Sequence, residues 1–473
     1  MTTACLQQFD EHVIRVATLK FGIPSHAVTD VVSKITQLPI RDGGLGLRSQ
    51  RASAPVAFLS SLAQAAPDIL RIKAQVGPTP QLDACIVEAY ECIVETGYFT
   101  RSRREDAVQL PPEPGDFLQH FQEGATHLRH LLLADIEAAQ AARLYQEADG
   151  VTRARMLSSA GYGAGAWLTA VPTETALTMS DESYQLAWRL RLGIPPYDDL
   201  PERCGSKDCL ASLRTDAYHY LSCVYVRRTA VTTRHDHLVR LFASMAREAG
   251  AFAIVEPSFD GARPDGEICW ATWSTRRDLV DVSVIHPTAA SYVRAAQTQL
   301  GAAKVRETQK KTRYADLAES SHCNLVPLVF ETYGALSQCC QDFVAQLNTA
   351  FLSAPGAEDL RDQRSVILQR LSVALQSGNA RVLAEGRQRS LAAHPPRMLR
   401  HPHVRPWQMA SNAGASQWQH GAGRALRDGS GDTSARRVWV VPNGVTSTRR
   451  VWVEPARDGA ARVHGKGDGP RRG

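Results

Sequence analysis

A Cys/His segment places the strongest local constraint on this chain of 473 residues. Four potential ligands fall within one short stretch in the pattern Cys204-x4-Cys209-x9-His219-x3-Cys223. Zinc takes four thiolate or imidazole ligands in a tetrahedron, and closely spaced cysteines supply two of them from one turn. The pattern therefore predicts a structural zinc knuckle, because a closed four-ligand site supports folding and leaves no open position for chemistry. The alternative is four unrelated buried side chains that bind no metal.

The positive charge of the chain is concentrated in its last 88 residues, 386–473, which contain 16 Lys and Arg against 5 Asp and Glu. The whole chain has a formal net charge of +6, so the preceding 385 residues carry about −5. This segment is also rich in Gly, Pro and Ser, a composition that cannot bury a core, so we predict a disordered basic tail. Because the body is not one basic surface, any nucleic-acid binding must depend on local sites.

Several classes of protein are excluded by composition. No run of about 18 uncharged apolar residues occurs, so no membrane span is predicted. The first residues lack a basic segment followed by an apolar stretch, so we do not expect secretion. Ten cysteines are too sparse for a disulfide scaffold, which favours a reducing compartment. We expect the nucleus if the host is eukaryotic and the cytoplasm otherwise.

The apolar spacing predicts a mixed α+β fold, with a helical N-terminal half and a small mixed sheet after the knuckle. The glycines of 38–47 predict a loop with unusual backbone angles. The expected segments are a helical segment over 1–100, a second over 101–195, the zinc knuckle over 196–232, an α/β domain over 233–352, a C-terminal helix over 353–385 and the tail over 386–473. The expected elements are helices near 51–66, 81–97, 125–147, 235–249, 290–319, 335–352 and 358–384, and strands near 252–256, 267–273, 279–285 and 324–330.

Two acids fall on strands that are expected to be neighbours. Asp265 stands at the entry to a strand, and Asp281 lies in the middle of Leu279-Val-Asp-Val-Ser-Val-Ile285, where alternation places it on one face with Ser283. A buried acid is costly unless it is paired or binds a cation. Two such acids can hold Mg²⁺ or Mn²⁺, which activates water and stabilises charge on a phosphate. Glu256, at the end of a strand, is a candidate third ligand, or equally an acid that faces solvent.

This layout resembles that of PD-(D/E)xK nucleases, in which a lysine follows the strand acid by two residues, but here Ser283 takes that place. Lys310 lies in the middle of a helical stripe with Glu307 and Tyr314, whereas Lys311 is rotated by about 100° toward solvent. Lys310 is therefore the candidate to orient water or neutralise phosphate, with support from Arg313. The alternative is a Glu307–Lys310 pair that only balances charge.

Basic residues near the knuckle are candidates for contacts with nucleic acid. Arg227 and Arg228 follow the knuckle, and Arg234-His235-Asp236 opens the next helix. Asp236 suits a helix N-terminus by its charge. Arg234 and His235 are candidates to contact phosphate, but structural capping of the helix is the favoured interpretation.

Six motifs of the chain, taken in order, resemble the C-terminal half of non-LTR retrotransposon polyproteins. They are the glycine loop, the knuckle, Arg234-His-Asp, Arg263-Pro-Asp265, Asp281-Val-Ser-Val284 and Lys310…Tyr314. The resemblance covers about residues 5–380 and is closest to the class with a restriction-enzyme-like endonuclease behind the reverse transcriptase. It implies that the knuckle and the Arg-His-Asp element bind nucleic acid. It also implies that Asp265, Asp281 and Lys310 nick target DNA, whose 3′ end primes reverse transcription. The place of Arg313 often holds a second lysine in this family. Residues 1–100 would be the end of the polymerase thumb and its connector.

The expected function is a metal-dependent DNA endonuclease segment of a retroelement, with zinc as structural metal, Mg²⁺ or Mn²⁺ as catalytic metal, and DNA and element RNA as partners. We expect no reverse transcriptase activity, because the only adjacent aspartates, Asp198-Asp199, lie in a proline-flanked loop, and we expect a truncated copy. The alternative is a catalytically dead, zinc-stabilised fragment that binds nucleic acid. In that case Ser283 marks the lost activity and Lys310 only pairs with Glu307.

Overall fold

The computed structural model describes residues 3–95, 109–209, 211–259, 263–270, 277–353 and 362–394, and the short pieces 453–454 and 462–463. Met1–Leu399 form one compact unit and Arg400–Gly473 a second. In the second unit the described residues are two short antiparallel strands, β5 (Val453–Glu454) and β6 (Arg462–Val463). The rest of the predicted tail from 395 onward lies outside the described residues.

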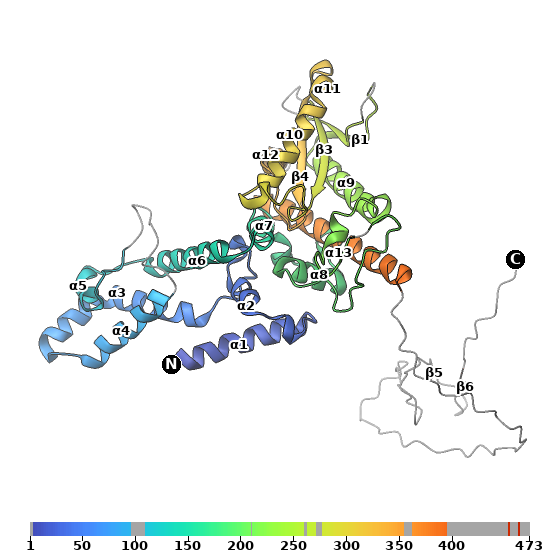
Figure 1. Cartoon of the computed structure of the whole chain (residues 1–473). Helices are drawn as coiled ribbons and strands as arrows, with labels where there is room; N and C mark the ends of the chain where they lie inside the picture. Colours follow the sequence, from blue (N-terminus) through green and yellow to red (C-terminus); the bar gives the residue numbers. More distant parts are fainter. Residues whose placement is uncertain are drawn as a thin grey trace, which may run out of the picture. The chain divides into compact units, whose positions relative to one another are not determined.

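The N-terminal half is helical, as predicted (Figure 1). Its helices are α1 (Thr3–Lys20), α2 (Asp30–Gln37), α3 (Gln50–Val76), α4 (Pro80–Glu95), α5 (Phe117–His120), α6 (Leu128–Glu147), α7 (Gly150–Ser159) and α8 (Asp181–Leu192). Helices α3 to α6 share one apolar cluster around Leu59, Ile93 and Leu132. Ser180 caps α8, because its hydroxyl accepts a hydrogen bond from the Ser183 N–H.

The glycine loop between α2 and α3 is fixed by a buried arginine. Gly43 and Gly46 have φ of 87° and 76°, the left-handed region that glycine adopts freely. Arg191 of α8 donates from Nε to the carbonyl of Gly44 at 2.9 Å and from Nη2 to that of Ile40 at 2.8 Å. Burial lowers the pKa of Arg191 to about 9. The loop thus has the unusual backbone predicted for it, and two of its carbonyls hold a guanidinium in the interior.

A four-stranded mixed sheet follows the knuckle. Its strands are β1 (Phe252–Val255), β2 (Gly266–Cys269), β3 (Arg277–Ile285) and β4 (Asn324–Glu331), and they lie in the order β1-β2-β3-β4. The pairs β1–β2 and β2–β3 are antiparallel, and β3–β4 is parallel. The helices of this region are α9 (Thr232–Glu248), α10 (Gly301–Arg313), α11 (Ala315–Ser320), α12 (Gln338–Ser353) and α13 (Arg364–Ala393). The prediction of a small mixed sheet is confirmed.

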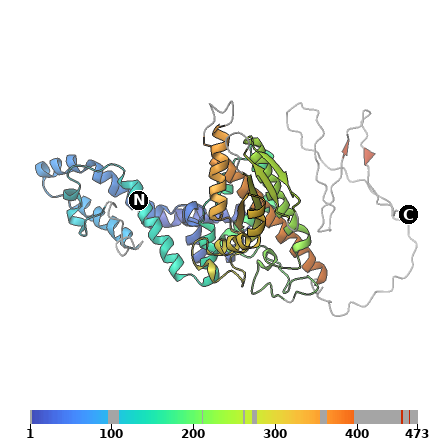
Figure 2. The same cartoon turned by 90° about the horizontal axis from the view of Figure 1, so that it is seen from above.

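Helices cover the sheet on both faces (Figure 2). Val280 and Val282 pack with Phe343 in a core that α9, α12 and α13 share. Ile285, on the other face of β3, packs against Ala302 and Ala303 of α10. Asp281 and Ser283 therefore lie under α10, as the alternation along the strand predicts.

The predicted helix over 290–319 is confirmed only from Gly301 onward and is wrong as one continuous helix. The chain makes a short 3₁₀ turn at Ala295–Gln297, takes a left-handed conformation at Leu300 with φ of 58°, and then forms α10 and α11 separately. A Cβ at Gly301 would lie 2.0 Å from the Ala295 carbonyl oxygen, so this close approach of the backbone requires glycine. The turn lets Ala296 and Ala302 both pack toward β3 and β4, which a straight helix would not allow.

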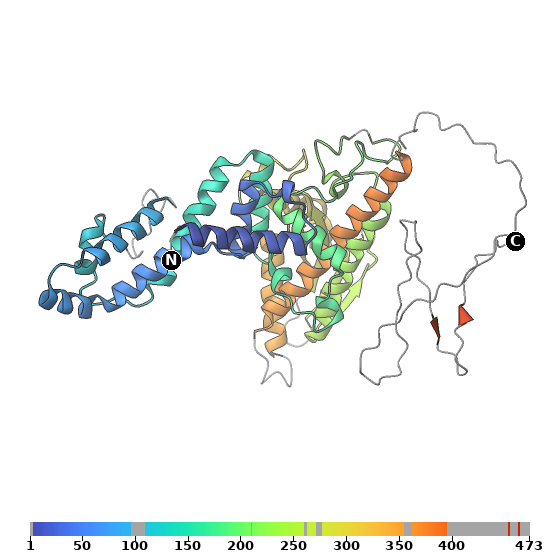
Figure 3. The same cartoon turned by 90° about the horizontal axis from the view of Figure 1, so that it is seen from below.

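The boundary between the predicted C-terminal helix and the tail is also wrong, because α13 continues to Ala393. The knuckle packs on its last turns: the hydroxyl of Tyr220 donates to Ser390 Oγ, and the backbone N–H of Gly205 donates to the same oxygen, both at 2.7 Å. Figure 3 shows α13 beside α9. The predicted strand over 267–273 ends at Cys269 within the described residues, and 271–276 lie outside them.

We predict that Gly386→Ala destabilises the protein. A Cβ at Gly386 would lie 2.3 Å from the Tyr220 ring, and overpacking of this kind costs about 1–3 kcal/mol. At an exposed helix position the same change would stabilise by about 1 kcal/mol. Urea unfolding should therefore show a lower midpoint for Gly386→Ala. Gly115→Ala, where a Cβ meets nothing within 4 Å, is the control. A midpoint that rises in Gly386→Ala would contradict the close packing of the knuckle on α13.

Candidate active site and metal centre

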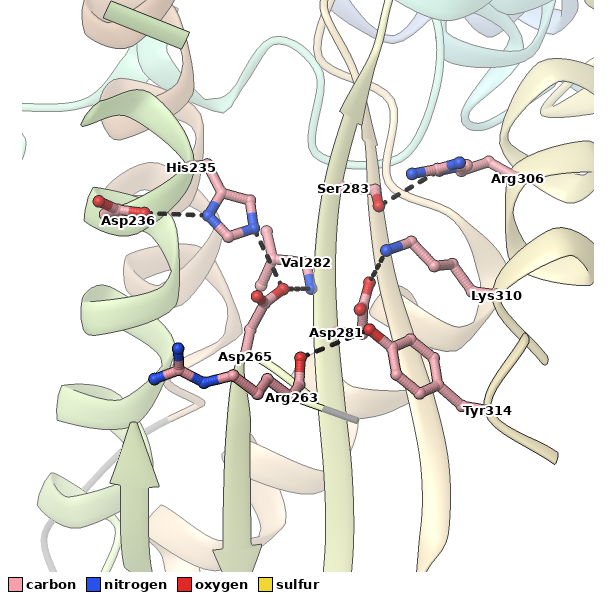
Figure 4. A network of polar contacts seen from close by, with 10 residues as sticks. All are labelled: His235, Asp236, Arg263, Asp265, Asp281, Val282, Ser283, Arg306, Lys310 and Tyr314. Atoms are coloured by element: carbon pink, nitrogen blue, oxygen red, sulfur yellow. Dashed lines mark hydrogen bonds and ion pairs between the residues drawn. The ribbon is translucent and has the colours of Figure 1, made fainter. Parts of the chain in front are cut away.

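The sheet register brings the two predicted acids together. Gly266 of β2 pairs with Val280 of β3, so Asp265 and Asp281 occupy the next opposed positions on these antiparallel strands. Figure 4 shows both side chains beside β3. Asp281 is buried and Asp265 is partly buried. The placement on neighbouring strands is the one that the sequence predicts.

Lys310 lies on the sheet-facing side of α10, as the helical spacing predicts, and it contacts Asp281. Its Nζ lies 2.5 Å from Asp281 Oδ2, and both side chains are more than nine-tenths buried (Figure 4). Glu307 has a different partner, since its Oε1 accepts a hydrogen bond from the backbone N–H of Cys339 at 2.9 Å. The structure thus favours the sheet-facing alternative for Lys310 over the Glu307 pair. Lys311 is exposed, as predicted.

Tyr314 and Arg313 lie at the end of α10 beside this ion pair. Lys310 Nζ is 5.7 Å from the centre of the Tyr314 ring, and Arg313 Cζ is 5.3 Å from it. The Tyr314 hydroxyl donates to the Arg263 carbonyl at 3.5 Å. Burial, followed by the charge of Asp281, raises the pKa of Tyr314 to about 12. Arg313 itself is exposed and stacks on the aromatic ring.

Helix α9 supplies a second cation, on Asp265. The second cation is His235. Asp265 Oδ2 accepts a hydrogen bond from the Val282 N–H at 2.7 Å and lies 3.1 Å from His235 Nε2. His235 Nδ1 lies 3.1 Å from Asp236 Oδ1. Burial lowers the pKa of His235, but hydrogen bonds and charge from Asp265 and Asp236 outweigh it and raise the pKa to about 9. His235 is therefore an imidazolium at neutral pH and donates to both carboxylates.

The structure adds Arg306, which the sequence analysis missed. Its Nε donates to Ser283 Oγ at 3.4 Å, from the turn of α10 that precedes Lys310 (Figure 4). The signal in the sequence was the four-residue spacing to Lys310, which places two cations on the same helix face.

Arg234 and Glu256 have partners other than the predicted phosphate and metal ion. Arg234 is buried and donates from Nη1 to Asn379 Oδ1 at 2.6 Å, so the predicted phosphate contact is wrong. Burial lowers the pKa of Arg234 to about 10. Glu256 is 66% exposed and lies 3.7 Å from the Arg263 guanidinium, so the solvent-facing alternative holds. The side chains of Arg227 and Arg228 lie outside the described residues.

The four Cys/His side chains form a second centre. Their ligand atoms all lie within 4.8 Å of one another. Cys204 Sγ is 3.9 Å from Cys223 Sγ, which is 4.0 Å from Cys209 Sγ, and Cys209 Sγ is 3.1 Å from His219 Nε2. Sulfur atoms about 2.3 Å from a tetrahedral zinc ion lie about 3.8 Å apart, so this group fits a metal such as zinc.

Local structure brings these ligands together. Cys204 and Cys209 belong to a small hairpin closed by the bridge between Arg203 and Ser212. His219 begins the 3₁₀ turn His219–Leu221, and Cys223 follows that turn. A hydrogen bond from the Cys223 thiol lowers the pKa of Cys204, which favours a thiolate at one ligand position.

The acid pair also has a donor set that suits a hard cation. The contacts of Asp265 with His235 and Val282 fall on Oδ2, and Lys310 contacts Oδ2 of Asp281. Mg²⁺ and Mn²⁺ prefer carboxylate oxygens and retain several waters. The carboxylates of Asp265 and Asp281 are the donor type that such an ion prefers, and each already pairs with a cation, His235 or Lys310.

Comparisons with known proteins give no family. Neither a scan against protein-family models nor a search of the curated proteins found a match. None of the described helices has both the length and the apolar character needed to cross a membrane.

We predict that the purified protein binds about one equivalent of zinc through the Cys/His group. Cys223→Ser should lose the metal and lower the thermal midpoint, because ligand binding to the folded state is part of the folding free energy. Elemental analysis and thermal unfolding measure both effects. Cys85→Ser, which changes an exposed thiol outside the group, is the control. Equal zinc content in the two variants would rule out this site.

We predict that His235 titrates near pH 9, because Asp265 and Asp236 hold it charged. In Asp265→Asn the pKa should fall toward the ordinary value of about 6.5. Resolved imidazole signals in an NMR pH titration measure both values. His286 is an internal reference, since burial lowers its pKa to about 3 and it should stay neutral above pH 5. An unchanged His235 pKa in the variant would exclude the contact with Asp265.

Proposed function

We propose that the chain is a metal-dependent DNA endonuclease segment of a non-LTR retroelement, in which an α/β domain of the PD-(D/E)xK type nicks target DNA. The observation that carries the proposal is the contact of Lys310 with Asp281, beside Asp265 on the next strand. An acid pair and a lysine are the charged groups of the PD-(D/E)xK pattern that the sequence resembles. DNA is the proposed substrate, element RNA an additional partner, and the nucleus of a eukaryotic host the proposed location.

Each residue has a role in the proposed hydrolysis. Asp265 and Asp281 hold Mg²⁺ or Mn²⁺, which when bound supplies Lewis acidity and a more acidic water. Lys310 neutralises negative charge that develops on the phosphate, because its ammonium group is fixed by the packing of α10 on the sheet. His235 positions Asp265 through the hydrogen bond to Oδ2. The zinc knuckle positions DNA through contacts to its backbone, which makes binding sensitive to salt.

A second candidate is a zinc-stabilised nucleic-acid-binding fragment without nuclease activity. The observation in its favour is Ser283, which stands where the pattern has lysine and carries no charge. Under this alternative the Lys310–Asp281 pair only balances a buried charge.

Plasmid nicking in Mg²⁺ or Mn²⁺ separates the two candidates. We expect nicking by the full chain and a loss of about 100-fold or more in Asp281→Ala, because a metal ligand contributes several kcal/mol to the transition state. Asp316→Ala, which removes an exposed acid from α11, is the matched control and should nick at the normal rate. Nicking that is absent in the unmodified chain, or equal in the two variants, would leave the binding fragment as the function.

A further inference from the structure

Helix α10 lies on β3, and two of its basic side chains contact residues of that strand. Lys310 contacts Asp281, and Arg306 contacts Ser283. Four helical residues rise about 6.0 Å and two strand residues about 6.6 Å, so the two spacings match. One turn of α10 therefore brings a guanidinium to the strand position where the pattern of this class has lysine.

Arg306 differs in its partners from Lys310, His235 and Arg263, whereas Arg313 stacks on the Tyr314 ring. Lys310 pairs with Asp281, His235 with Asp265, and Arg263 with Glu256. Arg306 donates to two neutral groups, Ser283 Oγ at 3.4 Å and Gln309 Oε1 at 3.2 Å. Within the described part of the chain, no carboxylate lies at ion-pair distance from it.

Such a charge is suited to bind an anion. Arg306 is partly buried, so its guanidinium has lost part of its hydration while keeping its full charge. A guanidinium offers N–H groups in a planar fork that matches two oxygens of a phosphate. Because the guanidinium contacts Ser283, it lies two strand residues, or about 6.6 Å, from the position of Asp281, where the proposed chemistry occurs.

We propose that Arg306 binds the scissile phosphate, supplying from α10 the charge that Ser283 cannot supply from β3. This inference rests on the proposed function and identifies the group that recognises its substrate, a phosphodiester. Arg306 contacts a non-bridging oxygen and stabilises the charge that develops there, in addition to Lys310, which stays in contact with Asp281.

Arg306→Gln tests the proposal, because glutamine keeps a hydrogen-bond donor for Ser283 but removes the charge. We expect the nicking rate at saturating DNA to fall about 100-fold, as for the loss of one donor to a developing oxyanion. Lys304→Gln, which removes an exposed charge from the same helix, should change kcat less than threefold, on the order of the usual effect of a single surface charge.

Ser283→Ala separates phosphate binding from structural support. It removes the contact and leaves the guanidinium, so we expect nearly normal nicking. A readout independent of activity is the salt dependence of binding to a short duplex without a divalent metal. The slope of log K against log salt should fall by about 1 in Arg306→Gln and remain unchanged in Ser283→Ala.

The outcomes distinguish this inference from the proposed function. No nicking by the unmodified chain refutes the proposed function and this inference with it. Nicking in which Arg306→Gln matches Lys304→Gln refutes the inference alone. Equal losses in Arg306→Gln and Ser283→Ala, with unchanged salt slopes, would make Arg306 a support for β3 and also refute it.

Discussion

The packing of α13 against three other parts of the chain is the constraint on which the arrangement of both sites depends. Leu371 and Leu375 belong to the core under the sheet, Val373 packs with the N-terminal helices, and Val382 and Leu383 pack with the knuckle. A helix of this length is a rigid rod. Because α13 contributes to three apolar clusters at once, it fixes the position of the knuckle relative to α9.

The orientation of α9 follows from that contact. A Cβ at Gly378 would lie 2.4 Å from Arg234 Cγ, so only glycine lets the arginine pass and reach Asn379. Consecutive helical residues are rotated by about 100°, so the burial of Arg234 against α13 turns His235 toward Asp265. The adjacent residues of Arg-His-Asp therefore have different roles: one anchors the helix and the next reaches the acid pair.

The imidazolium on Asp265 and the ammonium on Asp281 let two carboxylates lie together, and any divalent cation must compete with both.

Local patterns predicted those parts of the site that depend on one element. The alternation along β3 predicted the face of Asp281, and the helical spacing predicted that Lys310 faces the sheet. Each prediction needs only the side-chain periodicity of one element and one buried face. The burial of Arg234 was not predictable in this way, because it depends on the space left by Gly378, which lies far along the chain. The break at Leu300 was missed for a similar reason: apolar residues at helical spacing, Ala296, Leu300 and Ala303, run through it, and only the packing of Ala296 and Ala302 on the sheet shows the break.

The distance between the two sites along α13 has a consequence for the proposed function. Asn379 holds α9 through Arg234, and Ser390 holds the knuckle through Tyr220 and Gly205. These anchors are about three turns, or about 16 Å, apart on one helix. DNA held by the knuckle would then meet the acid pair at a nearly fixed offset, because the connection is a helix packed on both sides rather than a flexible linker. In this view zinc acts on catalysis through position alone, and the charges that act on the phosphate come from α10.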